Sequence, residues 1–261
     1  MGVLNVTPDS FSDGGRHGDT EDAVRHALLM LEQGAEIIDI GGESTRPGAR
    51  EVPANVELER VIPVLAALRP RTDATLSVDT RKSSVAAAAL EAGADWINDV
   101  SAGTHDPALL ETVAAARCTF VAMHARGEPA HMQDRPHYED PVREVVEELS
   151  ARVEACLKAG IEPSRLVLDP GIGFGKRLED NLALIRGLPR LKTMGYPILV
   201  GVSRKSFIGT LTSVAEPADR LGGTAAAVAA CVLGGADVLR VHDVAAMAQV
   251  VRVATAIVQV P

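Results

Sequence analysis

The stretch Arg165–Lys176, R-L-V-L-D-P-G-I-G-F-G-K, joins a short apolar run to a carboxylate, a proline and three glycines. The run Leu166–Leu168 has the length of a buried strand, and the glycines after Asp169 are typical of a loop. A phosphate-binding P-loop would need glycine at Pro170 and serine or threonine at Arg177. The alternating glycines also differ from the dinucleotide pattern G-x-G-x-x-G. The stretch therefore predicts a buried strand whose tip presents a carboxylate, without either nucleotide motif.

Similar units recur along the whole chain, each an apolar run that ends in polar residues and leads into a helical pattern. The other seven predicted strands are Gly2–Val6, Glu36–Ile40, Thr75–Val78, Trp96–Ile97, Thr119–Met123, Pro197–Val200 and Val238–Val241. Eight strand and helix pairs in 261 residues predict an α/β fold, a (β/α)8 TIM barrel in one domain over residues 1–261. A doubly wound open sheet is the alternative.

Helices are expected where apolar residues recur at helical spacing. After a first helix capped by Asp19 or Thr20 and ended by Gly34, the predicted helices are Asn55–Leu68, Ser83–Ala92, Pro107–Ala116, 141–159, Asn181–Leu188, Leu221–Leu233 and Val244–Val258. Asp140 followed by Pro141 is a strong helix start, and Pro63 is expected to kink its helix.

Composition limits the class of protein. Aromatic residues make up 3% of the chain, so alanine, valine and leucine must build the core, and the net charge of −9 argues against a nucleic-acid surface. Three widely spaced cysteines without a C-x-x-C pattern are typical of reduced core residues in a cytoplasmic protein. The sequence shows no leader pattern and no long apolar run, so we expect no signal peptide and no membrane span.

Polar residues stand at every predicted strand tip. They are Asn5, Asp39, Asp79, Asn98, Met123 with His124, Asp169, Ser203–Lys205 and Arg240–His242. In a barrel these tips meet on one rim, where active sites are built. Packing alone does not explain the set, because buried carboxylates are costly without partners. The pattern predicts a site on this rim.

The rim residues fall into two chemical classes. Asp79, Asn98 and Asp169 have short acceptor side chains, which suit a flat heterocycle with N–H donors along one edge, such as a 2-amino-pyrimidinone. The basic class suits phosphate oxygens and comprises Arg46, Lys205, Arg240 and His242. Asn5 is a neutral oxygen ligand suited to Mg²⁺, which takes few protein ligands beside phosphate and water.

Seven motifs in order along the chain carry a resemblance to the dihydropteroate synthases. They are M-G-V-L-N-V-T-P-D-S-F-S-D-G-G, I-I-D-I-G-G-E-S-T-R-P-G, S-V-D-T, I-N-D-V-S, L-D-P-G-I-G-F-G-K, G-V-S-R-K-S-F-I-G and L-R-V-H-D. The resemblance covers nearly the whole chain. It implies an enzyme that joins (7,8-dihydropterin-6-yl)methyl diphosphate to 4-aminobenzoate, releasing diphosphate, in folate synthesis.

The resemblance also implies a role for each matching residue. Asp79, Asn98 and Asp169 would hold the pterin, with Lys205 at its carbonyl edge and Met123 and Arg240 against its faces. Diphosphate would meet Asn5 through Mg²⁺, together with Thr45, Arg46, Arg240 and His242. The 4-aminobenzoate site would comprise Thr45, Arg46, Pro47, Phe174, Lys205 and Ser206. Catalysis would depend on Asp79, Asp169, Lys205, Arg240 and His242.

The family mechanism is dissociative, so diphosphate leaves before the arylamine attacks. The loops near Asp9 and Arg46 would then exclude water as lids. A homodimer through the last helices is expected, and so is sulfonamide sensitivity, since nothing is inserted between Phe174 and Asn181. Family members usually begin earlier, with a hairpin that closes the barrel floor, whereas here Met1 abuts the first strand.

Several alternatives stay open. Asp39 could brace the backbone of the second loop, and Asp9 and Asp13 could be loop caps. His105, His131 and His137 are expected to face solvent, and the helix Leu221–Leu233 to serve packing or an oligomer face. Rival functions are a pterin-binding methyltransferase with a corrinoid partner, a catalytically silent pterin-binding paralogue and a scaffold.

Overall fold

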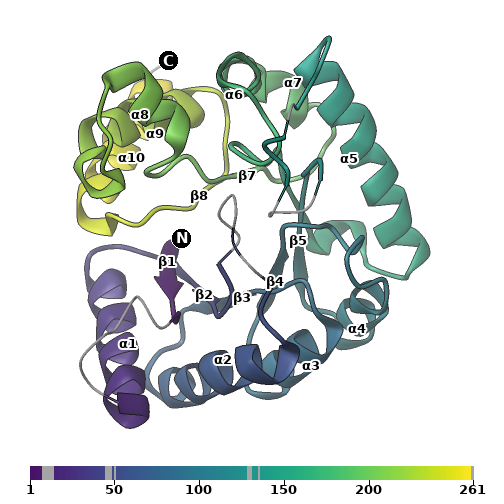
Figure 1. Cartoon of the computed structure of the whole chain (residues 1–261), viewed down its shortest axis with the longest axis vertical. Coiled ribbons are helices and arrows are strands. Elements are labelled where there is room, and N and C mark those ends of the chain that lie inside the picture. The colour runs from purple at the N-terminus through teal and green to yellow at the C-terminus, as the bar shows by residue number, and fades with distance from the viewer. Residues whose placement is uncertain (8–14, 45–48, 50, 128–130, 135, 260–261) are drawn as a thin grey trace.

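The computed structural model describes residues 1–7, 15–44, 49, 51–127, 131–134 and 136–259, with the backbone alone over 15–19. Within these ranges eight strands form the centre of the molecule, and helices surround them (Figure 1). The strands are β1 Gly2–Asn5, β2 Ile37–Gly41, β3 Thr75–Asp79, β4 Trp96–Asp99, β5 Thr119–Met123, β6 Leu166–Asp169, β7 Leu199–Val200 and β8 Val238–Leu239.

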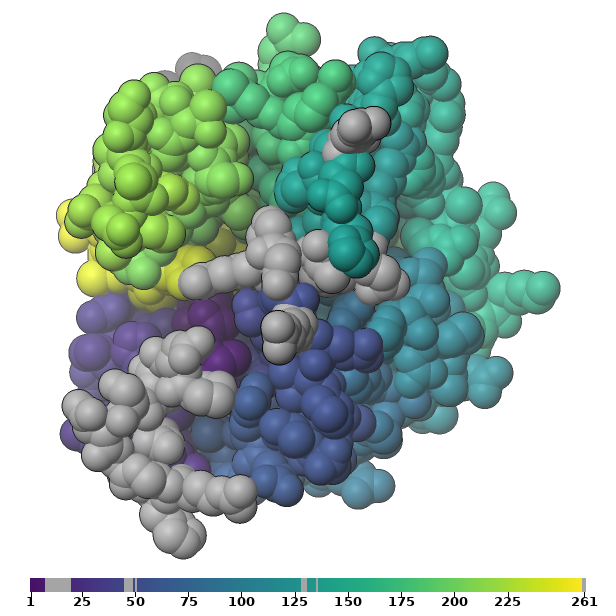
Figure 2. Space-filling view, viewed as in Figure 1, coloured from purple at the N-terminus to yellow at the C-terminus, as the bar shows by residue number. Residues whose placement is uncertain are grey.

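The strands close into a ring. β1 to β6 pair in chain order in one parallel sheet, and β7 pairs with β8 in a second. Parallel bridges join the sheets at both ends, between Gly2 and Val241 and between Leu168 and Ile198. β8 accordingly lies beside the purple start of the chain in Figure 1, and the yellow surface borders the purple surface in Figure 2. The predicted barrel is confirmed, and the open sheet was wrong.

Helices follow the strands as the apolar spacing predicts. The described helices are α1 Gly15–Glu32, α2 Ala54–Leu68, α3 Ser83–Glu91, α4 Ala108–Ala116, α5 Pro141–Lys158, α6 Leu178–Arg186, α7 Leu188–Lys192, α8 Ser206–Thr212, α9 Leu221–Leu233 and α10 Val244–Gln259, with 3-10 turns at Arg69–Arg71, Pro163–Arg165 and Pro217–Asp219.

Helix starts show where the predictions held. Asp140 caps α5 by accepting a hydrogen bond from the Arg143 amide at 3.1 Å, as predicted. The expected caps Asp19 and Thr20 were wrong, because α1 begins at Gly15 and both lie inside it. The short helices α7 and α8 were missed, since a few residues carry too little periodicity.

Side chains of the strands alternate between two apolar layers. One side, including Phe120, packs in the large core that the strands share with the helices. The other side forms a small apolar cluster of Val121, Val167 and Leu199, against which Met1, Trp96 and Val238 pack. The strand period of two puts the residues two positions further along on the same side. This small cluster is therefore a floor beneath Asn98, Met123, Asp169, Gly201 and Arg240.

Other features agree with the composition. Cys118, Cys156 and Cys231 are buried and form no disulfide. No helix in the described ranges has the length and hydropathy needed to cross a bilayer.

Candidate active site

A cavity opens above the apolar floor, at the carboxyl ends of the strands. It is lined by Asp79, Asn98, Val100, Met123, Asp169, Ile172, Phe174, Gly201, Lys205 and Arg240. All six residues expected to hold a pterin are in this lining. They come from strands far apart in sequence, and the closed ring brings their tips together.

Another cavity, of about 140 Å³, lies at the opposite end of the barrel, between Met1, Glu36 and Asp237. Its other lining residues are glycine and apolar side chains of β2, β8 and α10. The Met1 amino group donates to the Leu239 carbonyl at 3.0 Å. We place the site in the cavity at the carboxyl ends, where acidic, amide and basic groups converge.

Asp79 presents an unused acceptor to the cavity. Its Oδ2 accepts a hydrogen bond from Arg240 Nη2 at 3.0 Å, whereas its buried Oδ1 has no partner among the described residues. Burial raises the pKa of Asp79 to about 7, a shift that Arg240 opposes and neighbouring Asp39 increases. A buried oxygen without a donor is costly, so this atom is suited to a ligand that brings one.

Asp169 is the second buried carboxylate of the lining and is 5% exposed. Its Oδ1 accepts a hydrogen bond from the Gly171 amide at 2.7 Å. Burial raises the pKa of Asp169 to about 6, although the Gly171 hydrogen bond and the charge of Lys205 act in the opposite direction. Both carboxylates are thus poised to titrate near neutral pH.

Asp39 organises the cavity from below. It is fully buried and accepts hydrogen bonds from Ser77 Oγ at 2.6 Å, Asn98 Nδ2 at 3.1 Å and Arg240 Nε at 2.6 Å. The alternative that Asp39 braces the second loop was wrong, because its recorded partners are side chains of other strands. Its position two residues before Gly41 on β2 was the available signal, since it puts both on the inner face.

The basic groups are also held in place. Arg240 uses Nε on Asp39 and Nη2 on Asp79, and no hydrogen bond of Nη1 is recorded within the described part of the chain. Lys205 Nζ lies 4.2 Å from the centre of the Phe174 ring. A Cβ on Gly173, whose φ is +85°, would lie 3.1 Å from Lys205 Cδ, so glycine favours this close approach.

Asn5 and His242 lie at the same end of the barrel. Asn5 ends β1, and its Oδ1 is 3.8 Å from where a Cβ on Gly41 would lie; Asp79 Oδ2 is 3.9 Å from the same point. Gly41 thereby keeps open the space between the two side chains. Ser203 Oγ contacts His242 Nδ1 at 3.0 Å and fixes the orientation of the ring.

The histidines predicted at the rim or in solvent were placed only partly correctly. His124 does not line the cavity: it is 3% exposed and contacts Glu148 on α5, because it follows Met123 and so points to the opposite side. His105 does not face solvent freely, since it contacts both Arg81 and Glu51. Of the remaining histidines, His131 and His137 are exposed, as expected.

The rest of the predicted set lies outside the cavity lining. Ser206 is exposed at the first residue of α8. Thr45, Arg46, Pro47, Asp9 and Asp13 are outside the described residues.

A buried ionic cluster beside the site was missed from the sequence. Lys82 Nζ forms ion pairs with Glu43 and, at 2.6 Å, with Glu57, and Arg81 Nη2 donates to Glu43 at 2.7 Å. Glu43 follows the end of β2, and Arg81 and Lys82 follow that of β3. The cluster therefore links the second loop to the loop after β3. No spacing of residues in the sequence predicts these pairings.

Comparisons with known proteins agree with this site. The family model described as "Pterin binding enzyme" matches residues 1–242. A dihydropteroate synthase of Synechocystis sp. is 48% identical, covering 98% of this chain and 89% of the relative.

Two solved structures have the same fold. A Xanthomonas albilineans dihydropteroate synthase with 4-aminobenzoic acid has a TM-score of 0.94 at 50% identity, covering 100% of this chain and 93% of that one. A Yersinia pestis dihydropteroate synthase with a sulfonamide drug has a TM-score of 0.93 at 44% identity, covering 98% and 93%. The chain therefore belongs to the pterin-binding enzymes and, among them, to the dihydropteroate synthases.

Proposed function

We propose that this chain joins (7,8-dihydropterin-6-yl)methyl diphosphate to 4-aminobenzoate, giving 7,8-dihydropteroate and diphosphate for folate synthesis. The carrying observation is the buried Asp79 Oδ1, which lacks a donor in a cavity that also holds Asp169 and Asn98. A pterin edge offers the N–H groups that these acceptors need. The family supports the same substrate.

The pterin would lie on the apolar floor and contact the polar wall. Asp79 and Asp169 would accept its N–H groups as carboxylates, and Asn98, oriented by Asp39, would add an amide. Lys205 would meet the pterin carbonyl. Met123 and Arg240 would contact its faces.

The diphosphate would lie beside Arg240, His242 and Asn5. The Nη1 group of Arg240 is suited to a phosphate oxygen, since Nε and Nη2 are held by Asp39 and Asp79. Asn5 fits Mg²⁺ as a single neutral oxygen ligand, because such an ion is held mainly by diphosphate and water. When bound, Mg²⁺ would neutralise charge on the leaving group. From the second loop, Thr45 and Arg46 would join this site by resemblance.

The 4-aminobenzoate would enter next to Phe174. The ring of Phe174 and the stem of Lys205 form one wall, with Ser206 at its outer end. By resemblance, Thr45, Arg46 and Pro47 would complete this subsite. The relative from X. albilineans was solved with 4-aminobenzoic acid, which supports the assignment.

In the proposed reaction, diphosphate leaves before the arylamine attacks. The bond from the methylene carbon to the diphosphate oxygen breaks, and its electron pair leaves with diphosphate. The dihydropterin stabilises the resulting cation, the arylamine nitrogen then forms the new C–N bond, and one proton is lost. Arg240 and His242 would stabilise the charge on the leaving group, and the carboxylates Asp79 and Asp169 would hold the cation in place. No nucleophilic side chain is required.

A homodimer is proposed from the last helices. On α10, Val253 is 62% exposed and Ile257 61%, and Leu233 at the end of α9 is 56% exposed. A surface of this kind is suited to a second copy of the chain. Sedimentation should show a dimer that Ile257→Glu converts to monomers. The buried, unpaired cysteines suit a reducing cytoplasm.

The direct test is diphosphate release from the dihydropterin diphosphate with Mg²⁺, with and without 4-aminobenzoate. Release matched by dihydropteroate supports the synthase. Tight pterin binding without release would instead favour a silent paralogue. A sulfonamide should inhibit turnover by competing with 4-aminobenzoate, and full turnover at saturating drug would contradict the assigned subsite.

A further inference from the structure

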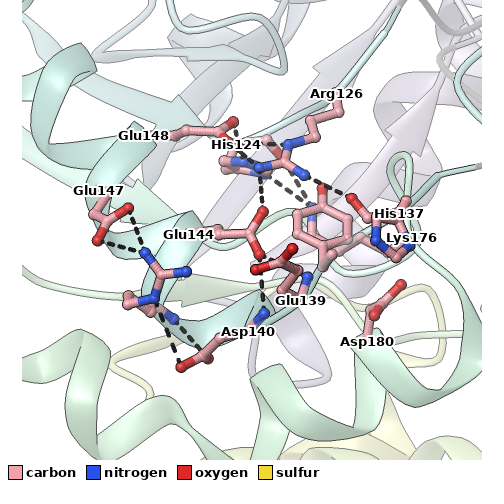
Figure 3. A network of polar contacts seen from close by, with 12 residues as sticks. His124, Arg126, His137, Glu139, Asp140, Glu144, Glu147, Glu148, Lys176 and Asp180 are labelled. Carbon is pink, nitrogen blue, oxygen red and sulfur yellow. Dashed lines mark hydrogen bonds and ion pairs between the residues drawn. The ribbon is translucent and has the colours of Figure 1, made fainter.

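A row of polar groups, buried at Lys176 and His124 and partly exposed at Glu148, lies behind the cavity wall, between β5, β6 and α5 (Figure 3). Lys176 Nζ donates to the Phe174 carbonyl at 3.0 Å and contacts His124 Nδ1 at 3.0 Å. His124 Nε2 in turn contacts Glu148 Oε2 at 2.9 Å. Lys176, His124 and Glu148 do not line the cavity. The row therefore reaches the site through the backbone of Phe174.

The contacts define the direction of each hydrogen bond. Glu148 is an acceptor, so His124 carries its hydrogen on Nε2 and accepts on Nδ1 from Lys176. Burial, together with the charge of Lys176, lowers the pKa of His124 to about 4, so the imidazole is neutral near pH 7. The amine of Lys176 is thus the donor that both His124 and Phe174 require.

The glycine loop after β6 packs directly on the residues after β5. Gly171 has φ +67° and Gly175 φ +60°, and a Cβ at these positions would lie 1.8 Å from the His124 carbonyl oxygen and 2.4 Å from that of Arg126. Two backbones in contact leave no room for side chains between them. Lys176, which follows Gly175, bonds the two segments together.

Lys176 is 3% exposed, and no ion pair with a described carboxylate is recorded for its amine. Burial lowers the pKa of Lys176 to about 7, although Asp169 and Glu148 act against the shift. In either protonation state the amine keeps at least two N–H groups, enough for the Phe174 carbonyl and His124 Nδ1. Burying an amine costs free energy, and the hydrogen bonds that it donates to Phe174 and His124 offset part of this cost.

We propose that Lys176 is a positioning residue for 4-aminobenzoate: through the Phe174 carbonyl and His124 it holds the Phe174 ring in the cavity wall. The inference rests on the proposed function for the identity of the ligand. It predicts that loss of the amine affects the arylamine subsite more than the pterin subsite, because Asp79 and Asn98 lie on other strands and Asp169 lies within β6, before the glycine loop.

The test is steady-state kinetics of Lys176→Met, which keeps an apolar stem without donors. The KM for 4-aminobenzoate should rise about tenfold, with a smaller change in the KM for the pterin diphosphate. A purely structural role would reduce the folded fraction, which lowers kcat and leaves both KM values unchanged. That result would overturn the proposal.

Arg126→Met is the matched control. Arg126 donates to Glu148, at the outer end of the row, at 2.9 Å and to Glu144 at 2.8 Å, and no hydrogen bond or ion pair joins its side chain to Lys176. It should lower thermal stability and leave the KM for 4-aminobenzoate unchanged. An equal rise of this KM in the control would also overturn the proposal.

His124→Leu keeps the test decisive if Lys176→Met fails to fold. It removes one of the two strong contacts of Lys176, so the KM for 4-aminobenzoate should rise about threefold. The double variant should be no worse than Lys176→Met, because both changes act through one contact. Additive effects would contradict this linkage.

Hydrogen exchange separates this inference from the proposed function. Amides of residues 171–175 should exchange faster in Lys176→Met than in Arg126→Met, whether or not the enzyme turns over. If the wild-type chain made no dihydropteroate, the function would fail, and exchange would still decide the role of Lys176 in holding the loop. Equal exchange in both variants would overturn it.

Discussion

Two buried charge clusters lie close together in this barrel, and they differ in how their charges are satisfied. In the loop cluster, defined as Glu43, Glu57, Arg81 and Lys82, each carboxylate receives a hydrogen bond from a buried cation, although Glu57 Oε1, like Asp79 Oδ1, has no partner among the described residues. In the rim cluster, defined as Asp39, Asp79, Asp169 and Arg240, Asp79 keeps an oxygen without a donor and Asp169 lacks a direct ion pair among the described residues.

The pKa directions express the same difference. Burial alone would raise the pKa of Glu43, but hydrogen bonds from Lys82 and Arg81 outweigh it and leave the pKa below its ordinary value. Burial wins in the rim cluster, where the pKa of Asp79 is raised to about 7 and that of Asp169 to about 6. The loop cluster, in which every carboxylate has a cation partner, holds loops together, whereas the carboxylates Asp79 and Asp169 of the rim cluster line the cavity and keep binding capacity for a ligand.

The largest effect is expected from breaking the loop cluster. Lys82→Met should lower the free energy of unfolding by about 3–5 kcal/mol, because Glu57 is then left buried without its cation. Chemical denaturation measures this loss. Arg143→Met, which breaks the exposed pair with Glu147, is the control and should cost less than about 0.5 kcal/mol. An equally small loss of stability in Lys82→Met would show that Glu57 does not depend on the Lys82 cation.

Opening the rim cluster further should affect binding instead of stability. Asp79→Asn should weaken pterin binding about 100-fold, close to 2.7 kcal/mol, because a charged acceptor is lost. The free energy of unfolding at pH 8 should change by less than about 1 kcal/mol, since loss of the ion pair with Arg240 is offset by removal of a buried charge whose Oδ1 has no donor. Calorimetric titration and denaturation measure the two quantities. Normal pterin affinity in Asp79→Asn would show that Asp79 does not bind the pterin. Normal affinity in Asp169→Asn would show the same for Asp169.

Asp39 links the two kinds of cluster, because it is fully satisfied yet serves the site. Asp39→Asn should reduce kcat/KM about tenfold to thirtyfold, near 1.4–2 kcal/mol, by loosening Asn98 and Arg240. Ser77→Ala is a milder control that removes one donor to the same carboxylate and should cost about threefold. Equal effects of the two changes would argue against orientation of Arg240 by charge.

The smallest expected effect is a difference between the two clusters in their dependence on pH. Between pH 8 and 6, protonation of Asp79 and then Asp169 should weaken pterin binding about tenfold, near 1.4 kcal/mol. Because both folded pKa values are raised, these groups should add stability as the pH falls over this range. Glu43 has a lowered pKa, so its contribution should be lost only below about 4.5, its ordinary value. Binding that does not vary from pH 8 to 6 would contradict the raised values.

Particular residues show how far prediction from sequence could go. Asp79, Asn98 and Asp169 could be placed on one rim, because strand tips of a closed barrel must converge. His124 was misassigned to that rim, since the exact end of a strand decides which side the next residue faces. Asp39 was undecided because its partners lie on β3, on β4 and directly after β8, and no local pattern contains them.

The sequence by itself determined the alternation of strands and helices, the barrel class, the pterin-type acceptors and the family, because these depend on local periodicity and on motifs that stand in order. Only the tertiary structure decided which charges are satisfied. Lys82 meets Glu57, Lys176 meets His124, and Arg240 meets Asp39 across long separations in the chain. Such pairings arise where neighbouring units of the ring pack side by side and, for Arg240 and Asp39, where the ring closes, and burial then determines how strongly each charge interacts.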